Sequence, residues 1–184
     1  MKLFHNAVLL VLSSGVIAMA ADTARPSVAK TQDALLSQVE REVVGLAEAM
    51  PADKYNFAPT QGEFNGVRTF GQQMSHIAAV LNGFSAGLLG ESNINLGELE
   101  NGPASLKDKD DIVKYLKDAF AHAHKAANTL TAENFTEVVK LPWESETKGA
   151  IAEFSIAHTL DHYGQAVVYA RMNGIVPPAS RKQQ

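Results

Sequence analysis

Two histidines near the end of the sequence, His158 and His162, have the spacing of a metal-binding pair. Residues four apart stack on one face of a helix, where two imidazoles can chelate the same ion. Ile151 and Phe154 precede them on this stripe and Tyr169 continues it, which indicates that the pair faces the protein core. Buried imidazoles need polar partners, so we expect either a shared metal ion or hydrogen bonds between core histidines.

His76 is the third candidate ligand. It lies beside Ile77, at the edge of an apolar seam and about nine residues into an earlier predicted helix. His158 lies about ten residues into its own helix, so both are near the middle whichever way the helices run. Facing histidines can bridge the 8–10 Å between packed helices through one ion. The sequence therefore predicts a metal site of His76, His158 and His162, with ordinary core histidines as the alternative.

Other metal schemes fail on the residues present. The residues three positions before the three histidines are Gln73, Ser155 and Thr159. None is the glutamate of the Glu-x-x-His pairs in di-iron bundles, and no glutamate follows His158 as in zinc proteases. Three imidazoles leave a position open for water or substrate, and zinc, nickel and iron all accept them. His122 and His124 are two apart, so they face different sides of a helix, and we interpret both as solvated.

Three further residues belong to the surroundings of the expected site. Gln165 shares the stripe of the two histidines, and we expect it either to hydrogen-bond a ligating imidazole or to pack in the bundle. Asp161 is about 100° around the helix from its neighbouring ligand, so we interpret it as a solvated or bridging charge, not as a base. Trp143 is interpreted as a lid over one end of the bundle or as part of a pocket mouth.

Four helices are predicted to position these residues, at about 28–50, 67–89, 105–130 and 148–173, with Ser105 as the cap of the third. No alternating run is long enough to predict a strand, so we expect an all-α four-helix bundle. The connections 51–66, 90–105 and 130–147 exceed the roughly 2–8 residues expected between antiparallel neighbours. A 16-residue link extends ~53 Å, so at least one connection can cross the length of the bundle.

Composition narrows the class of protein. The 184 residues are 46% apolar and 20% charged, as in one ordinary globular domain. A formal net charge of −4 gives no support for nucleic-acid binding. Cysteine is absent, which excludes disulfides, thiolate zinc sites, iron–sulfur clusters and cysteine nucleophiles.

The first 20 residues are predicted to be a secretory signal. Lys2 precedes an apolar run that is too short to span a bilayer, and the run ends in Ala18-Met19-Ala20. We expect cleavage before Ala21, which leaves a domain of residues 21–184, with an uncleaved anchor as the alternative. An exported chain without cysteine fits a bacterial periplasm, with no membrane association after cleavage.

Several motifs of the chain occur together in one known family. In the first half they are Tyr55-Asn56-Phe57-Ala58-Pro59, Arg68-Thr69-Phe70-Gly71 and Ser75-His76-Ile77-Ala78. In the second half they are His158-Thr159-Leu160-Asp161-His162-Tyr163-Gly164-Gln165 and the tail from Tyr169 to Pro178. Over about residues 28–180 the chain resembles the DinB-like family, and the motif of the last helix is the more specific part.

The resemblance implies a bundle whose helices run up-down-down-up. It also implies a divalent metal held by one histidine of the second helix and a His-x-x-x-His pair of the fourth, which match His76, His158 and His162. Some relatives are metal-dependent transferases or isomerases that use low-molecular-weight thiols, and others are called hydrolases. Export departs from this pattern, because the cytosolic thiols are not an obvious supply outside the cytoplasm.

We therefore expect a periplasmic, metal-dependent hydrolase or transferase that acts on an unidentified small molecule. No general base is evident, so a metal- or ligand-binding bundle without catalysis is the alternative hypothesis. A bundle that holds haem non-covalently through methionine and histidine is a third. A homodimer is left open, and neither nucleic acid nor membrane is expected as a partner.

Overall fold

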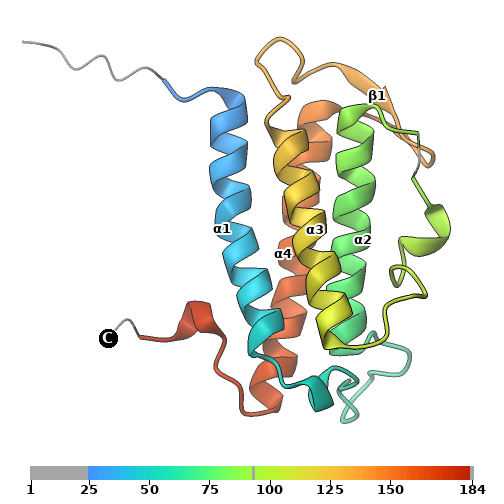
Figure 1. Ribbon diagram of the computed structural model, residues 1–184, viewed down its shortest axis with the longest axis vertical. Coiled ribbons are helices and arrows are strands. Elements are labelled where there is room, and N and C mark those ends of the chain that lie inside the picture. The colour runs from blue at the N-terminus through green and yellow to red at the C-terminus, as the bar shows by residue number, and fades with distance from the viewer. Residues whose placement is uncertain (1–24, 93, 183–184) are drawn as a thin grey trace, which may run out of the picture.

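Four long helices pack side by side in the computed structural model, which describes residues 25–92 and 94–182 (Figure 1). They are α1 (Val28–Ala49), α2 (Phe70–Leu89), α3 (Lys109–Ala127) and α4 (Lys148–Met172). Helices α2 and α3 run opposite to α1 and α4, and each of α1 and α2 contacts both α3 and α4. The predicted all-α bundle with up-down-down-up order is confirmed. The predicted signal, residues 1–20, lies outside the described residues.

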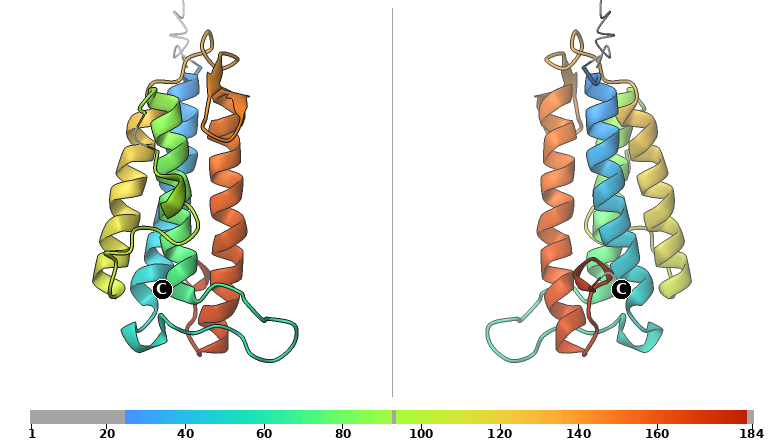
Figure 2. Two further views of the ribbon diagram at one scale, coloured as in Figure 1. Left: turned by 90° about the vertical axis from the view of Figure 1, so that its right-hand side faces the viewer. Right: turned by 90° about the vertical axis from the view of Figure 1, so that its left-hand side faces the viewer.

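The α2–α3 link (residues 90–108) is the long crossover. Because α2 and α3 are parallel neighbours, this link returns along the length of the bundle and includes the short turn η2 (Leu96–Glu98) (Figures 1 and 2). It packs on α2, where a Cβ added at Gly83 would lie 3.1 Å from Leu99 Cδ2. The crossover therefore places the backbone around Leu99 beside α2, a position that matters for the site described below.

Helix α2 is the most buried helix. Sixteen of its 20 residues are buried, because α3, α4 and the α2–α3 link cover it on different sides. The predicted seam of this helix is buried throughout: Phe70, Met74, Ile77, Leu81, Phe84 and Leu88. At its N-terminal end the Tyr55 hydroxyl donates to the Ala47 carbonyl (2.7 Å), which anchors the α1–α2 link on the core. This packing fixes the position of each polar side chain on α2.

Polar side chains cap the helices as their sequences require. Thr69 forms a reciprocal capping box with Gln72, and Gly90 ends α2 in the left-handed conformation. The predicted cap of the third helix at Ser105 is wrong. The helix begins at Lys109, because the Asp108 carboxylate accepts from two backbone N–H groups of the first turn.

The link between α3 and α4 contains a feature that the sequence did not predict. Strands β1 (Val138–Lys140) and β2 (Ser145–Thr147) form a two-stranded antiparallel hairpin at one end of the bundle. Three residues per strand are too few for alternation to be recognised in the sequence. None of the helices within residues 25–92 and 94–182 combines the length and the hydropathy of a membrane span.

Candidate metal centre

The three predicted ligands meet between α2 and α4. The ring centroids of His76 and His158 are 4.5 Å from that of His162 and 5.0 Å from each other. One ring nitrogen from each residue lies within 4.8 Å of the other two, so the set can hold a metal ion. In the part of the chain that the structure describes, no further histidine or carboxylate belongs to this group.

Helix geometry explains this convergence. His158 and His162 are one turn apart on α4, and α2 runs antiparallel beside it with His76 at the level of the pair. His76 and His162 are buried, whereas His158 is partly exposed. The stripe of α4 is less uniformly buried than the sequence indicated, because Phe154 is 55% exposed. The site is therefore closed on the side of His76 and open beside His158.

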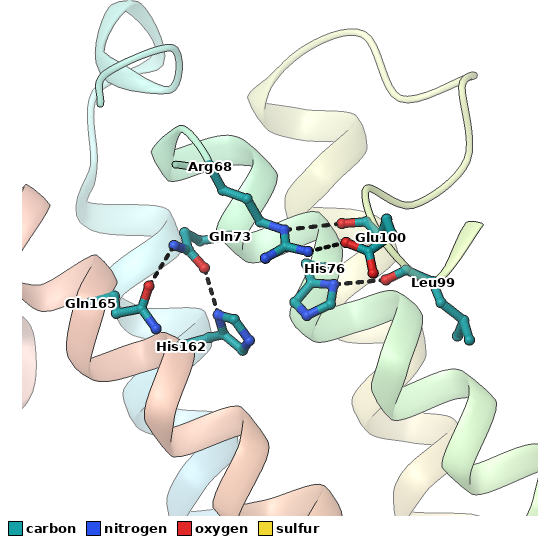
Figure 3. A network of polar contacts seen from close by, with 7 residues as sticks. All are labelled: Arg68, Gln73, His76, Leu99, Glu100, His162 and Gln165. Carbon is teal, nitrogen blue, oxygen red and sulfur yellow. Dashed lines mark hydrogen bonds and ion pairs between the residues drawn. The ribbon is translucent and has the colours of Figure 1, made fainter. Parts of the chain in front are cut away.

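The hydrogen bonds of two ligands leave their Nε2 atoms free for a metal. His76 Nδ1 is 2.7 Å from the Leu99 carbonyl oxygen, which only accepts, so this nitrogen carries the proton (Figure 3). His162 Nδ1 is 2.7 Å from Gln73 Oε1 (Figure 3). Metal-binding histidines commonly donate their second ring nitrogen to a carbonyl in this way. The donor set fits a divalent ion such as zinc, nickel or iron.

The surroundings keep the three imidazoles neutral. Burial, followed by the charges of neighbouring histidines, lowers the pKa of His158 and of His162 to about 4. Burial and the nearby Arg68 also lower the pKa of His76. Metal ions bind the deprotonated imidazole, so at neutral pH all three ligands are in the form that a metal requires.

Arg68 is a charged residue of the site whose role the sequence did not reveal, although it opens the motif Arg68-Thr69-Phe70-Gly71. Its guanidinium contributes to the lowered pKa of all three histidines. The same guanidinium forms an ion pair with the Glu100 carboxylate and donates from Nε to the Glu100 carbonyl (3.1 Å) (Figure 3). The α2–α3 link thus supplies both the acceptor for His76 and the counter-ion for Arg68.

Gln165 lies one hydrogen bond further from the imidazole than expected. Its Oε1 accepts from Gln73 Nε2 (3.0 Å), and Gln73 in turn contacts His162 (Figure 3). From the sequence, Gln73 was interpreted only as a residue that stands where a di-iron Glu-x-x-His pair has its glutamate. A signal was nevertheless present, since Gln73-x-x-His76 and His162-x-x-Gln165 place one glutamine a turn from each buried ligand.

An apolar hollow adjoins the open side of the cluster. The Phe154 ring packs against His158 (6.0 Å between centroids) and against Phe84 (5.7 Å). The hollow has a volume of about 520 Å³ and is lined by Phe84, Ile151, Phe154 and Ala157 among others, with Glu144, Glu146 and Glu153. Trp143 stacks edge-on against Phe84, next to the hollow. Phe154 thus both lines the hollow and contacts His158.

The interpretation of the other two helical histidines as solvated is wrong. His124 is partly buried and lies between two carboxylates of α1, 2.7 Å from Asp33 and 3.1 Å from Glu40. His122 is likewise partly buried, with Nε2 3.3 Å from a carboxylate oxygen of Glu91. The two histidines point to opposite sides of α3, as their spacing requires. On one side His122 meets the α2–α3 link, and on the other His124 meets α1.

The chain belongs to the DinB superfamily, whose sequence profile it matches over residues 35–166. The expected resemblance is therefore confirmed. No curated protein matches the sequence.

Two solved structures have the same fold. A DinB-like protein from Bacillus subtilis is 17% identical, with a TM-score of 0.63 over 83% of this chain and 99% of that one. A DinB-like protein from Bacillus cereus is 16% identical, with a TM-score of 0.61 over 78% of this chain and 93% of that one. At these identities the likeness concerns the fold.

Proposed function

We propose that the protein is an exported, metal-dependent enzyme of the DinB superfamily, a hydrolase or a transferase. His76, His158 and His162 would hold one divalent ion. The observation that carries this proposal is the cluster of three ring nitrogens within 4.8 Å, with no other ligand group among the described residues. Such a set leaves coordination positions for water or substrate, as catalytic sites do.

The chemistry of the site follows from what surrounds the cluster. When bound, a divalent ion activates a water molecule or polarises an oxygen or sulfur atom of a substrate. Arg68 places a positive charge near the three imidazoles, where it can stabilise negative charge on a reacting group. The partly exposed His158 marks the side from which a substrate would approach.

The hollow beside His158 supports a small molecule with an apolar portion as the substrate. Phe84 and Phe154 line the hollow, and the Phe154 ring contacts His158. Three glutamates also line the hollow, and their negative charges disfavour an anionic group on the part of the substrate that lies there. We propose no nucleic-acid or membrane partner, and a homodimer would leave this hollow accessible only if it formed elsewhere on the surface.

Elemental analysis tests the metal site. We expect protein purified from its native compartment to contain about one divalent ion per chain. His158→Ala should lose it, because two ligands bind far more weakly than three, whereas the fold should persist since this side chain is partly exposed. Metal-free native protein, or unchanged metal content in His158→Ala, would refute the proposal.

A metal- or ligand-binding bundle without catalysis is the second candidate. It is favoured because, among residues 25–92 and 94–182, no carboxylate joins the cluster, where a general base would be expected. Metal-loaded protein should be assayed on esters, amides and thiol conjugates, with His158→Ala in parallel. Turnover that depends on the histidines establishes the enzyme, and its absence with full metal content favours the binding protein.

Export is proposed from residues 1–20 and the cleavage site before Ala21. The mature domain would comprise residues 21–184. Mass spectrometry of protein recovered from a periplasmic extract should give an N-terminus at Ala21 or one residue later. A full-length chain in the cytoplasm would contradict this location.

A further inference from the structure

We propose that Asp161, Gln165 and Gln73 form a relay of hydrogen bonds that fixes His162 in the tautomer with a free Nε2. These are positioning residues, and the inference rests on the proposed metal site. The amides of Gln73 and Gln165 do not by themselves determine which group donates, because a glutamine side chain can present its oxygen or its NH₂ group to a neighbour. The direction of the relay must therefore be set at one end.

The relay begins at an acceptor on the surface of α4. Gln165 Nε2 is 3.1 Å from Asp161 Oδ2, one helical turn earlier, and both side chains are exposed. An ionised carboxylate has only acceptors, so Gln165 must turn its NH₂ group towards Asp161. Its Oε1 then faces the interior. The Asp161 charge thus decides the orientation of the first amide.

The second amide carries this orientation to α2. Gln165 Oε1 accepts from Gln73 Nε2 at 3.0 Å, and Gln73 is buried with 2% of its surface exposed (Figure 3). With its NH₂ group engaged, Gln73 has only its Oε1 to offer on the other side. That atom lies 2.7 Å from His162 Nδ1. His162 must then donate from Nδ1, which leaves the Nε2 lone pair for the ion.

The two buried ligands therefore have their tautomers fixed by different means. The acceptor of His76 is the Leu99 backbone carbonyl, which cannot reverse its role. The acceptor of His162 is the Gln73 side-chain amide, which could turn over and present its NH₂ group if its neighbours allowed it. The relay removes this freedom. Because it runs through Asp161 on the surface, a change there can alter a ligand three hydrogen bonds away.

Nitrogen NMR of metal-free protein labelled with ¹⁵N-histidine reads the tautomer directly. We expect His162 to carry its proton on Nδ1 in the unmodified protein. In Asp161→Asn the first residue of the relay can donate as well as accept, so both amides can reverse and a population with the proton on Nε2 should appear. This readout needs no metal. It therefore separates failure of the relay from failure of the proposed metal site.

Metal affinity provides the second measurement, with Zn²⁺ as the probe. Asp161→Asn should weaken binding by about tenfold, as loss of a group that orients a ligand commonly does. Part of this loss would come from removing a negative charge near the ion. Asp118→Asn on α3 is the matched control for a general charge effect, since it makes the same substitution at another exposed position.

Gln73→Glu isolates the orienting effect. A carboxylate at this position accepts from His162 Nδ1 whatever Gln165 does, so it replaces the relay with a fixed acceptor. In the Gln73→Glu background, Asp161→Asn should lose most of its effect on Zn²⁺ affinity, and what remains measures the charge effect. An equal loss in both backgrounds, or an unchanged His162 tautomer in Asp161→Asn, would overturn the inference.

Discussion

The imidazole rings of His76 and His162 meet edge to face, with their centroids 4.5 Å apart and their planes at 79°. One ring comes from α2 and the other from α4. An ion shared by these rings and His158 would join α2 and α4 in addition to their packing and the hydrogen bonds of Gln73. Metal binding and the stability of the bundle should therefore depend on each other.

Metal should stabilise the fold through these ligands. Zn²⁺ at 100 times its dissociation constant should raise the free energy of unfolding by about 2.7 kcal/mol, because only the folded chain presents the three nitrogens together. Chemical denaturation with Zn²⁺ and with a chelator measures the difference. His76→Ala should abolish most of it, whereas His122→Ala should retain it, since His122 lies outside the cluster. A Zn²⁺ effect that survives His76→Ala would place the ion elsewhere.

Arg68 and Glu100 should change metal affinity in opposite directions. Arg68→Gln removes a positive charge that acts on all three histidines, so the divalent ion should bind more tightly. Glu100→Gln removes a negative charge near His76 and frees Arg68 from its partner, so the ion should bind more weakly. In a partly solvated site, one such charge should change the free energy of metal binding by about 1 kcal/mol, which is less than tenfold in affinity. Titration calorimetry with Zn²⁺ measures both, and shifts of the same sign would contradict this account.

His124 should make the α1–α3 contact dependent on pH. Burial alone lowers its pKa, but hydrogen bonds to Asp33 and Glu40 outweigh burial and raise the pKa above 6.5. A raised folded-state pKa means that the contribution to stability is complete below the unfolded value of about 6.5 and is lost as pH rises through the folded value. The free energy of unfolding in urea should therefore exceed that of His124→Gln by more at pH 6 than at pH 9. An advantage that does not change with pH would exclude a charged imidazole at this contact.

Two glycines of α4 should respond oppositely to alanine. A Cβ at Gly149 would lie 2.3 Å from the Phe135 ring, so Gly149→Ala should displace that ring and destabilise the fold by roughly 1–3 kcal/mol. Gly164 has no atom within 4 Å of such a Cβ, so Gly164→Ala should stabilise by about 0.5–1 kcal/mol through helix propensity. Thermal unfolding of both variants at one pH measures the pair. Destabilisation by Gly164→Ala would mean that this helix position has a constraint beyond backbone entropy.

The sequence was sufficient to predict the four helices and the three histidines that meet in a cluster able to hold a metal. Helical periodicity is a local property, so the seam of α2 from Phe70 to Leu88 could be assigned before any neighbour was known. The same holds for His158 and His162, whose four-residue spacing fixes their common face. Resemblance to the family supplied the helix directions, and the length of the α2–α3 link agrees with them.

Tertiary structure alone decided what surrounds these ligands. Leu99 and Arg68 reach the cluster from the crossover and from the segment before α2, and spacing along one helix does not predict such approaches. Gln73 lies one turn from His76 on α2, but only the packing of α2 against α4 brings it to His162. His124 was misinterpreted for the same reason, because Asp33 and Glu40 reach it from another helix. The amino-acid pattern determines which face of each helix turns inward. The rotation and height of that helix against its neighbours depend on packing of the whole bundle, and they decide which polar atoms meet.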